Sequence, residues 1–102
     1  MGCSFESVQI PRGVLTLGKN AFRSCENLNQ VFLPSSLTTI KSEAFGDCPN
    51  LIEVTLPQSV KELEPCAFVD CVNLAAALVP KSAMIVPDAF LRCPKLVAVT
   101  KY

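Results

Sequence analysis

Residues 21–34 read AFRSCENLNQVFLP, in which an aromatic residue, a thiol, an amide and a proline are set between apolar positions. Taken alone, this stretch could be a reactive site built around Cys25. The same pattern, however, returns along the whole chain at an almost constant interval. The stretch is therefore one unit of a repeat, and the period decides how each of its residues is interpreted.

Columns of equivalent residues, 22 or 23 positions apart, define the repeat. Each unit carries an Ala-Phe pair, then a cysteine and a leucine at intervals of three residues, and later an aliphatic residue followed by proline. So many columns in register predict one domain over residues 1–102, with about four units of 22–23 residues and no clear capping units. The main columns are Phe22, Phe45, Phe68 and Phe90; Cys25, Cys48, Cys71 and Cys93; and Pro11, Pro34, Pro57 and Pro80.

Each unit divides into three parts. Residues 28–34, LNQVFLP, alternate as in a short strand, which the proline ends because it has no N–H to donate. Residues 35–40, SSLTTI, are expected to turn the chain and return two aliphatic side chains to the interior. Residues 42–48, SEAFGDC, are expected to form about one helical turn, and Pro65 and Pro87 stand at its early positions, where a missing N–H costs least.

A unit of this size cannot bury its own apolar face, whereas stacked copies can share a continuous core. Parallel strands from successive units should pair about 4.8 Å apart, in a right-handed coil like other parallel crossovers. The predicted fold is a right-handed repeat solenoid, with short parallel strands on one face and short helical turns on the other.

Three motifs together carry a family resemblance: L-x-x-V-x-L-P, then V/L-x-x-I/L, then A-F-x-x-C-x-N-L. They resemble the leucine-rich repeats of the bacterial surface antigen type, the BspA-like family, and the match covers essentially the whole chain. The resemblance implies binding, since such repeats are associated with cell-surface attachment and protein recognition. It implies a cell-surface location if the chain is part of a longer protein. Otherwise an intracellular location is expected, because no signal peptide is visible.

Composition excludes several classes of function. Nine Lys or Arg residues balance nine Asp or Glu residues without a run of like charge, so nucleic acid and anionic membranes are not expected partners. The chain lacks histidine, the commonest general base and metal ligand. Its longest apolar stretch, residues 74–80, is far below the roughly 20 residues of a transmembrane helix. We therefore expect no catalysis, cofactor, metal ion or transmembrane segment.

The cysteine column has two interpretations. A row of buried thiols, repeated because the interior position has one size, is favoured over a metal or redox site, since the chain has no C-x-x-C or Cys–His pair. Neighbouring members could reach disulfide distance, although the fold does not require it. Cys66 belongs to another column, with Asn20, Glu43 and Asp88, and should be exposed near a helix start. An ordinary surface cysteine is favoured over a reactive one there, because no base lies nearby in sequence.

The first residues admit a further interpretation. Met1-Gly2-Cys3 resembles the start of a doubly acylated protein, but Glu6 stands where that pattern has Ser or Thr. Projecting the repeat back by 23 residues from Leu28 places Phe5 in the core, and leaves Cys3 one residue off the cysteine column. A core Phe5 would tie this segment into the solenoid, which disfavours lipidation.

The concave strand face is where solenoids of this kind usually bind partners. Its outward side chains change from polar to apolar along the chain, and a contiguous exposed apolar patch favours an interface. A rival interpretation is that these positions are simply small and neutral. The predicted partner-binding residues are Gln30, Phe32, Glu53, Thr55, Ala76, Leu78 and Thr100.

Two functions fit these expectations. The first is a non-catalytic protein-binding or scaffold module that uses its concave face, its uncapped ends or both. The alternative is a structural subunit that fills space within a large multiprotein assembly. Because repeat arrays need terminal units with a polar outer face, the uncapped ends predict that the chain is either part of a longer array or covered by neighbours, for example by end-to-end packing against neighbouring chains.

Overall fold

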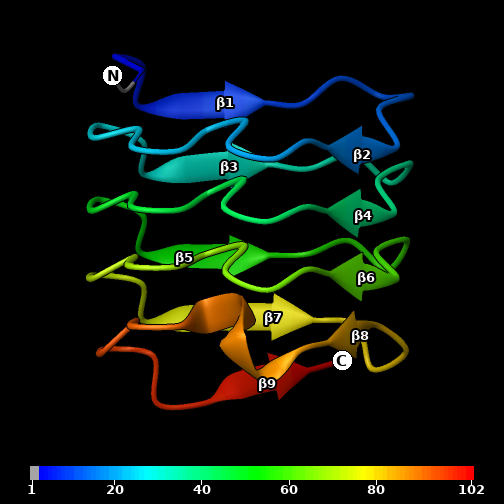
Figure 1. The fold of residues 1–102 in the computed structure, drawn as a ribbon. Helices are drawn as coiled ribbons and strands as arrows, with labels where there is room; N and C mark the ends of the chain where they lie inside the picture. The colour runs from blue at the N-terminus through cyan, green and yellow to red at the C-terminus, as the bar shows by residue number, and fades with distance from the viewer. Residues whose placement is uncertain (1–2) are drawn as a thin grey trace.

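A computed structural model describes residues 3–102. The chain winds into a parallel β-solenoid of about four turns, with one coil stacked on the next and extents of 31 × 30 × 18 Å (Figure 1). In Figure 1 the long strands run from left to right at the back, and the chain returns from right to left in front while it descends. The coil is therefore right-handed.

One row of strands forms the surface that we call the strand face. Where neighbouring strands of this row pair, they run parallel at a spacing of 23 residues, or 22 in the last coil, so that Val8 lies beside Val31 and Ala77 beside Val99. The row consists of β1 (Ser7–Gln9), β3 (Gln30–Phe32), β5 (Glu53–Thr55), β7 (Ala76–Val79) and β9 (Val99–Lys101). It is divided into a two-stranded sheet, β1–β3, and a three-stranded sheet, β5–β7–β9.

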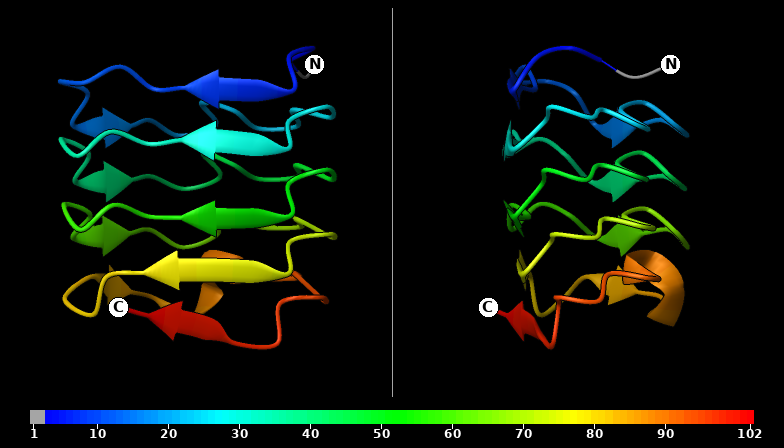
Figure 2. Two further views of the ribbon diagram at one scale, coloured as in Figure 1. Left: turned by 180° about the vertical axis from the view of Figure 1, so that it is seen from behind. Right: turned by 90° about the vertical axis from the view of Figure 1, so that its left-hand side faces the viewer.

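A second row of strands, which the sequence pattern did not predict, forms the second face. It pairs as one continuous four-stranded parallel sheet, and Figure 2 shows it as a column apart from the strand face. Two residues are too few to show an alternating pattern, so the sequence predicted only a turn here. The strands are β2 (Thr16–Leu17), β4 (Thr39–Ile40), β6 (Glu62–Leu63) and β8 (Met84–Ile85).

The predicted helical turns are wrong for most of the units. Among residues 3–102 the one helix is η1 (Pro87–Phe90), a short 3-10 helix in the last unit. The equivalent segments of the earlier units are tight turns, because two columns of residues adopt left-handed backbone angles that a right-handed helix cannot contain. These residues are Asn20, Glu43 and Cys66, with φ of 61°, 59° and 64°, and Ser24, Asp47, Asp70 and Arg92, with φ of 60°, 55°, 58° and 57°.

The turns bond within themselves, as Gly46 N–H does to the Glu43 carbonyl oxygen at 3.1 Å, and they also bond to the next coil. Phe45 N–H donates to the Ala67 carbonyl oxygen at 2.9 Å, and Asp47 N–H donates to that of Val69 at 2.7 Å. The last unit is one residue shorter, and its Asp88, which is equivalent to Cys66, lies within η1. The repeat therefore satisfies part of its backbone groups within each turn and part between coils, the latter as in a sheet.

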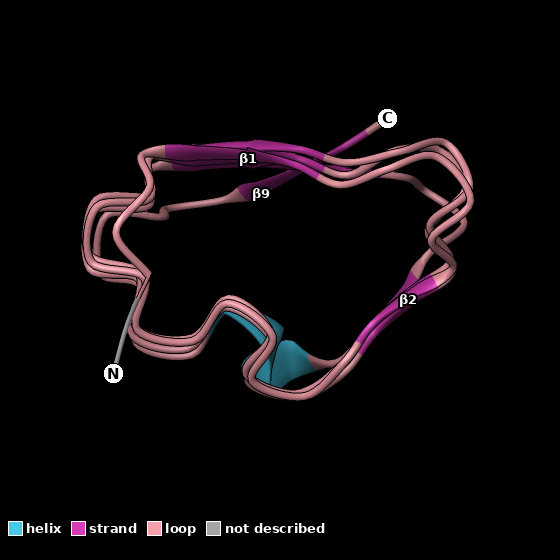
Figure 3. Cartoon of the chain, turned by 90° about the horizontal axis from the view of Figure 1, so that it is seen from above, coloured by secondary structure: helices cyan, strands magenta, loops and turns pink. Residues whose placement is uncertain are grey.

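The core is one continuous cluster that runs along the solenoid axis. Seen along this axis, the successive coils superpose (Figure 3). The phenylalanine column forms a stack, in which ring centroids lie 5.4 Å apart for Phe22 and Phe45, and 5.2 Å apart for Phe45 and Phe68. The ring of Phe90 continues the stack at 5.2 Å from Phe68.

Phe5 is not the core residue that the repeat predicted. Its side chain is 42% exposed and packs edge-on against Phe22, with ring centroids 6.3 Å apart. No described coil covers its other side, so the residue covers the end of the phenylalanine stack without being enclosed.

Replacing Phe45 with alanine should lower the free energy of unfolding by about 3–5 kcal/mol, because a fully buried ring is lost from the middle of the stack. Phe32→Ala is the matched control, since its ring is 54% exposed, and it should cost less than about 1 kcal/mol. Urea denaturation followed by circular dichroism measures both. Equal losses in the two variants would contradict the role of the stack.

Replacing Cys66 with asparagine should raise the free energy of unfolding by roughly 0.5–1 kcal/mol, since asparagine tolerates the left-handed backbone better. Asn20 occupies the equivalent position with φ 61° and serves as the internal comparison, so that Asn20→Ala should destabilise. Thermal and urea unfolding measure both changes. A loss of stability in Cys66→Asn would show that packing of the thiol outweighs the backbone.

Candidate partner-binding face

All seven residues predicted to bind a partner lie on the strand face with exposed side chains. Alternation within each short strand sets this arrangement, because Val31, Val54 and Ala77 turn inward while their neighbours turn outward. Phe32 and Leu78 are the large apolar members, with side chains 54% and 37% exposed. The exposure was predictable from the sequence, whereas binding by these residues stays a prediction.

The structure brings four of these residues to one hollow of about 250 Å³ on the strand face. The hollow lies between β3 and β5, and Asn29 and Val31 complete its lining. The residues of the set that line it are Gln30, Phe32, Glu53 and Thr55. Ala76, Leu78 and Thr100 lie farther along the face, on β7 and β9.

A second apolar surface, which the sequence analysis did not single out, lies at the last coil. Val97 is 93% exposed, and it lines a hollow of about 390 Å³ together with Phe90 and Leu96. Phe90 and Leu96 belong to the interior columns of the repeat. The repeat pattern identifies both as interior positions, and within residues 3–102 no further coil stacks on them.

The asparagines of the A-F-x-x-C-x-N-L motif, Asn27, Asn50 and Asn73, form a column that fastens each coil to the one before it. Asn50 Nδ2 donates to the Glu26 carbonyl oxygen at 2.6 Å, and Asn73 Nδ2 donates to that of Pro49 at 2.7 Å. In the last unit Lys95 replaces the amide, and its Nζ donates to Asn73 Oδ1 at 2.7 Å. The column therefore has a structural role.

Three members of the cysteine column are buried thiols, as predicted. Each Sγ donates to the phenylalanine carbonyl oxygen of the preceding coil, at 3.3 Å for Cys48, 3.1 Å for Cys71 and 3.1 Å for Cys93. The flanking thiols of Cys48 and Cys93, followed by burial, raise the pKa of Cys71. The neighbouring Cys71 thiol lowers the pKa of Cys93 to about 7, because it can donate a hydrogen bond to the Cys93 thiolate. Across residues 3–102 no three or more potential ligands gather to hold a metal ion.

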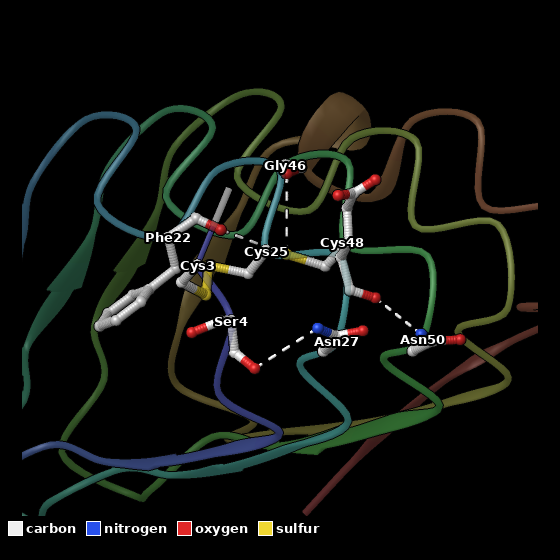
Figure 4. The surroundings of a disulfide bond; sticks show 9 residues. Cys3, Ser4, Phe22, Cys25, Asn27, Gly46, Cys48 and Asn50 are labelled. Atoms are coloured by element: carbon white, nitrogen blue, oxygen red, sulfur yellow. Dashed lines mark hydrogen bonds between the residues drawn. A yellow bond between two sulfur atoms is a disulfide. The ribbon is translucent and has the colours of Figure 1, made fainter. Parts of the chain in front are cut away.

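Cys25 is not a free buried thiol, which corrects the sequence interpretation. It forms a disulfide with Cys3, with Cα atoms 4.6 Å apart (Figure 4). The N-terminal segment precedes the first strand and is not held in the repeat register, so an offset of one residue does not prevent the bond. Closing a loop of this length stabilises the fold by about 3 kcal/mol. The bond also blocks acylation of Cys3, while Gly2 lies outside the described residues.

Cys66 is a half-buried free cysteine in a tight turn, and not a residue at a helix start. The charged side chains near it pair across coils. Arg92 donates to both carboxylate oxygens of Asp70, at 2.6 and 3.1 Å, and this hydrogen bonding lowers the pKa of Asp70. Arg23 and Glu43 form a second such pair at 3.2 Å. These exposed pairs join neighbouring coils and do not form a catalytic set.

Comparison with solved structures defines the class of the protein. A leucine-rich cell surface protein from Faecalibacterium prausnitzii matches with a TM-score of 0.84 and 21% identity, over 98% of this chain and 33% of that one. A leucine-rich repeat protein from Bacteroides ovatus matches with a TM-score of 0.83 and 27% identity, over 92% of this chain and 24% of that one. The leucine-rich repeat protein of T. pallidum matches with a TM-score of 0.61 and 28% identity, over 93% and 56%.

These likenesses place the fold among leucine-rich-repeat solenoids. A family model described as "BspA type Leucine rich repeat region (6 copies)" matches residues 1–101. The chain therefore belongs to the BspA-type leucine-rich-repeat family, as its motifs indicated. It spans about a quarter to just over half of the three solved chains. No curated protein matches it, and residues 3–102 contain no helix long and apolar enough to cross a membrane.

Thiol labelling of the native protein should modify Cys66 first, because Cys48, Cys71 and Cys93 are buried and Cys25 is in a disulfide. A maleimide reagent followed by peptide mass spectrometry measures the order. Cys66→Ser serves as the control and should remove the fast phase. A fast phase that persists in this variant would show that an interior thiol is accessible.

Proposed function

We propose that the chain is a non-catalytic binding module that recognises protein partners through its strand face, as in cell-surface recognition or attachment. The observation that carries the proposal is the grouping of Gln30, Phe32, Glu53 and Thr55 around one hollow on that face. Family membership supports a role in protein–protein interaction or surface recognition. Among the described residues, the ion pairs and the buried thiols contribute to the stability of the fold. No nucleophilic side chain of this part of the chain is paired with a base.

The chemistry of the face suits a protein surface. Phe32 presents a large apolar side chain, 54% exposed, next to the amide of Gln30 and the carboxylate of Glu53. An aromatic anchor surrounded by polar groups is the usual composition of an interface centre. Leu78, on the neighbouring sheet, extends the apolar surface toward β7.

The apolar hollow at the last coil favours a contact through the end of the solenoid, which suits the alternative of a structural subunit that fills space within a large multiprotein assembly. Phe90 and Leu96 are equivalent to residues that are fully buried in the inner coils, and Val97 adds a 93% exposed apolar side chain beside them. Contact through this end and contact through the strand face use different residues, so the two candidates can be separated by mutation.

Serine variants at Phe32 and Leu78 should each abolish capture of partners from an extract of the organism that encodes the chain, because each removes apolar surface from the strand face. Met84→Ser is the matched control, since Met84 is 71% exposed on the second face. Affinity capture with quantitative mass spectrometry compares the bound proteins.

The variants that lose partner capture identify the surface that binds. Partners that survive Phe32→Ser and Leu78→Ser but disappear with Val97→Ser would overturn the strand-face proposal in favour of end-to-end packing. Partners lost only with Met84→Ser would place the interface on the second face and contradict both candidates. Circular dichroism of every variant confirms that loss of capture does not come from unfolding.

A further inference from the structure

The strand face is interrupted at one level of the solenoid. β1 pairs with β3 and β5 pairs with β7, yet no backbone hydrogen bond joins β3 to β5 within the described chain. Figures 1 and 2 both show these two strands set farther apart than β1 and β3. The ladder is therefore open between the second and third coils.

The same two coils remain bonded on their other sides. On the second face β4 pairs with β6, and in the turns Phe45 N–H donates to the Ala67 carbonyl oxygen at 2.9 Å. The asparagine bond from Asn50 to the Glu26 carbonyl oxygen, at 2.6 Å, also holds just before β5 begins. The opening is thus local to the strand face, and the rest of the coil holds it in place.

Equivalent positions in other coils identify the backbone groups left free. Ile10 and Leu56 N–H groups each donate at 2.9 Å to the following coil, at the Phe32 and Leu78 carbonyl oxygens. Leu33 holds the same column position and makes no such bond to the Thr55 carbonyl oxygen.

The same comparison can be made for the residues that come just before the strands begin. Asn29 N–H donates to the Glu6 carbonyl oxygen at 2.8 Å, and Ala75 N–H donates to that of Ile52 at 2.7 Å. The corresponding bond, from Ile52 N–H to the Asn29 carbonyl oxygen, is missing. Each strand at the opening therefore has one N–H group and one carbonyl oxygen without a partner across the gap. These are Leu33 N–H and the Asn29 carbonyl oxygen on the β3 side, and Ile52 N–H and the Thr55 carbonyl oxygen on the β5 side.

From this arrangement we propose that the opening between β3 and β5 binds an extended peptide segment, whose backbone pairs with the free edges of the two strands. This inference rests on the proposed function and names the kind of partner that the strand face takes. An extended backbone is the ligand that offers N–H and C=O groups at the spacing of a sheet edge. A folded partner surface made of side chains cannot satisfy both edges.

The lining side chains define the peptide further. Glu53 is the one charged residue that lines the hollow, and Phe32 is its large exposed apolar side chain. A segment with a basic residue near Glu53 and an apolar residue beside Phe32 complements both. Since side chains of an extended strand alternate, the residues between them would point toward buried Val54 and have to be small.

Insertion requires the strand face to spread until the peptide lies about 4.8 Å from each neighbour. The backbone bonds that would resist this movement on the strand face are absent between these two coils. The hydrogen bonds in the turns and on the second face stay intact during this movement. They act as a hinge about which β3 and β5 separate.

Amide hydrogen exchange of the free protein, followed by NMR, tests the opening itself. Leu33 N–H should exchange at least about tenfold faster than Leu56 N–H, and Ile52 N–H at least about tenfold faster than Ala75 N–H, because hydrogen-bonded amides are protected. Equal protection within each pair would show that the ladder is closed in solution and would overturn the proposal.

Fluorescence anisotropy with a labelled probe, the blocked heptapeptide TAVAKAV, tests the ligand. The probe should bind and slow exchange at Leu33 and Ile52. The same peptide N-methylated at alternate residues has no backbone N–H donors along one edge, and it should bind at least about tenfold more weakly. Phe32→Ala should also weaken binding about tenfold, and Glu53→Gln should reduce its dependence on salt. Met84→Ser is the control and should bind normally.

The outcomes separate this inference from the proposed function. Absence of probe binding, or equal binding of the N-methylated probe, overturns peptide pairing even if Phe32→Ser and Leu78→Ser abolish partner capture. Probe binding with protection of Leu33 and Ile52 supports the pairing even if those serine variants leave partner capture unchanged, a result that would overturn the wider function alone.

Discussion

Registry between successive coils is the constraint on which the structure depends. Each residue lies beside its equivalent 22 or 23 positions later, and the backbone groups of one coil find their partners on the next. A single coil has neither a core nor satisfied backbone groups, because both come from the neighbours above and below. The constancy of the repeat length is therefore as important as the chemistry of the repeated residues.

This constraint explains the less usual features of the chain. Non-glycine residues such as Glu43 and Cys66 adopt left-handed backbone angles at a local cost, because the tight turns they make direct N–H groups toward the next coil. The Phe stack follows from the same registry, since equal spacing places each ring over the previous one at 5.2–5.4 Å. In the last unit, which is one residue shorter, η1 replaces the first left-handed position, while Arg92 keeps the second.

Residues that do not hold successive coils together are the ones available for binding a partner. Interior columns and asparagine bonds hold the coils together, so the proposed recognition uses outward positions such as Phe32 and Glu53, whose identity changes from coil to coil. A break in the ladder adds backbone groups to that surface. The opening between β3 and β5 lies where these outward residues gather, so the unpaired backbone groups and the exposed side chains occupy the same part of the strand face.

The sequence by itself determined the period, the family and the inward or outward direction of the strand residues, because each is a local pattern repeated often enough to be recognised. It did not determine the second face, the tight turns or the Cys3–Cys25 disulfide. Two-residue strands carry no periodicity, left-handed angles at Glu43 or Cys66 depend on bonds to the next coil, and Cys3 lies outside the register that would have predicted its partner. The opening between β3 and β5 is decided by tertiary structure alone, since their residues follow the same columns as the strands that pair, and only the placement of whole coils separates them.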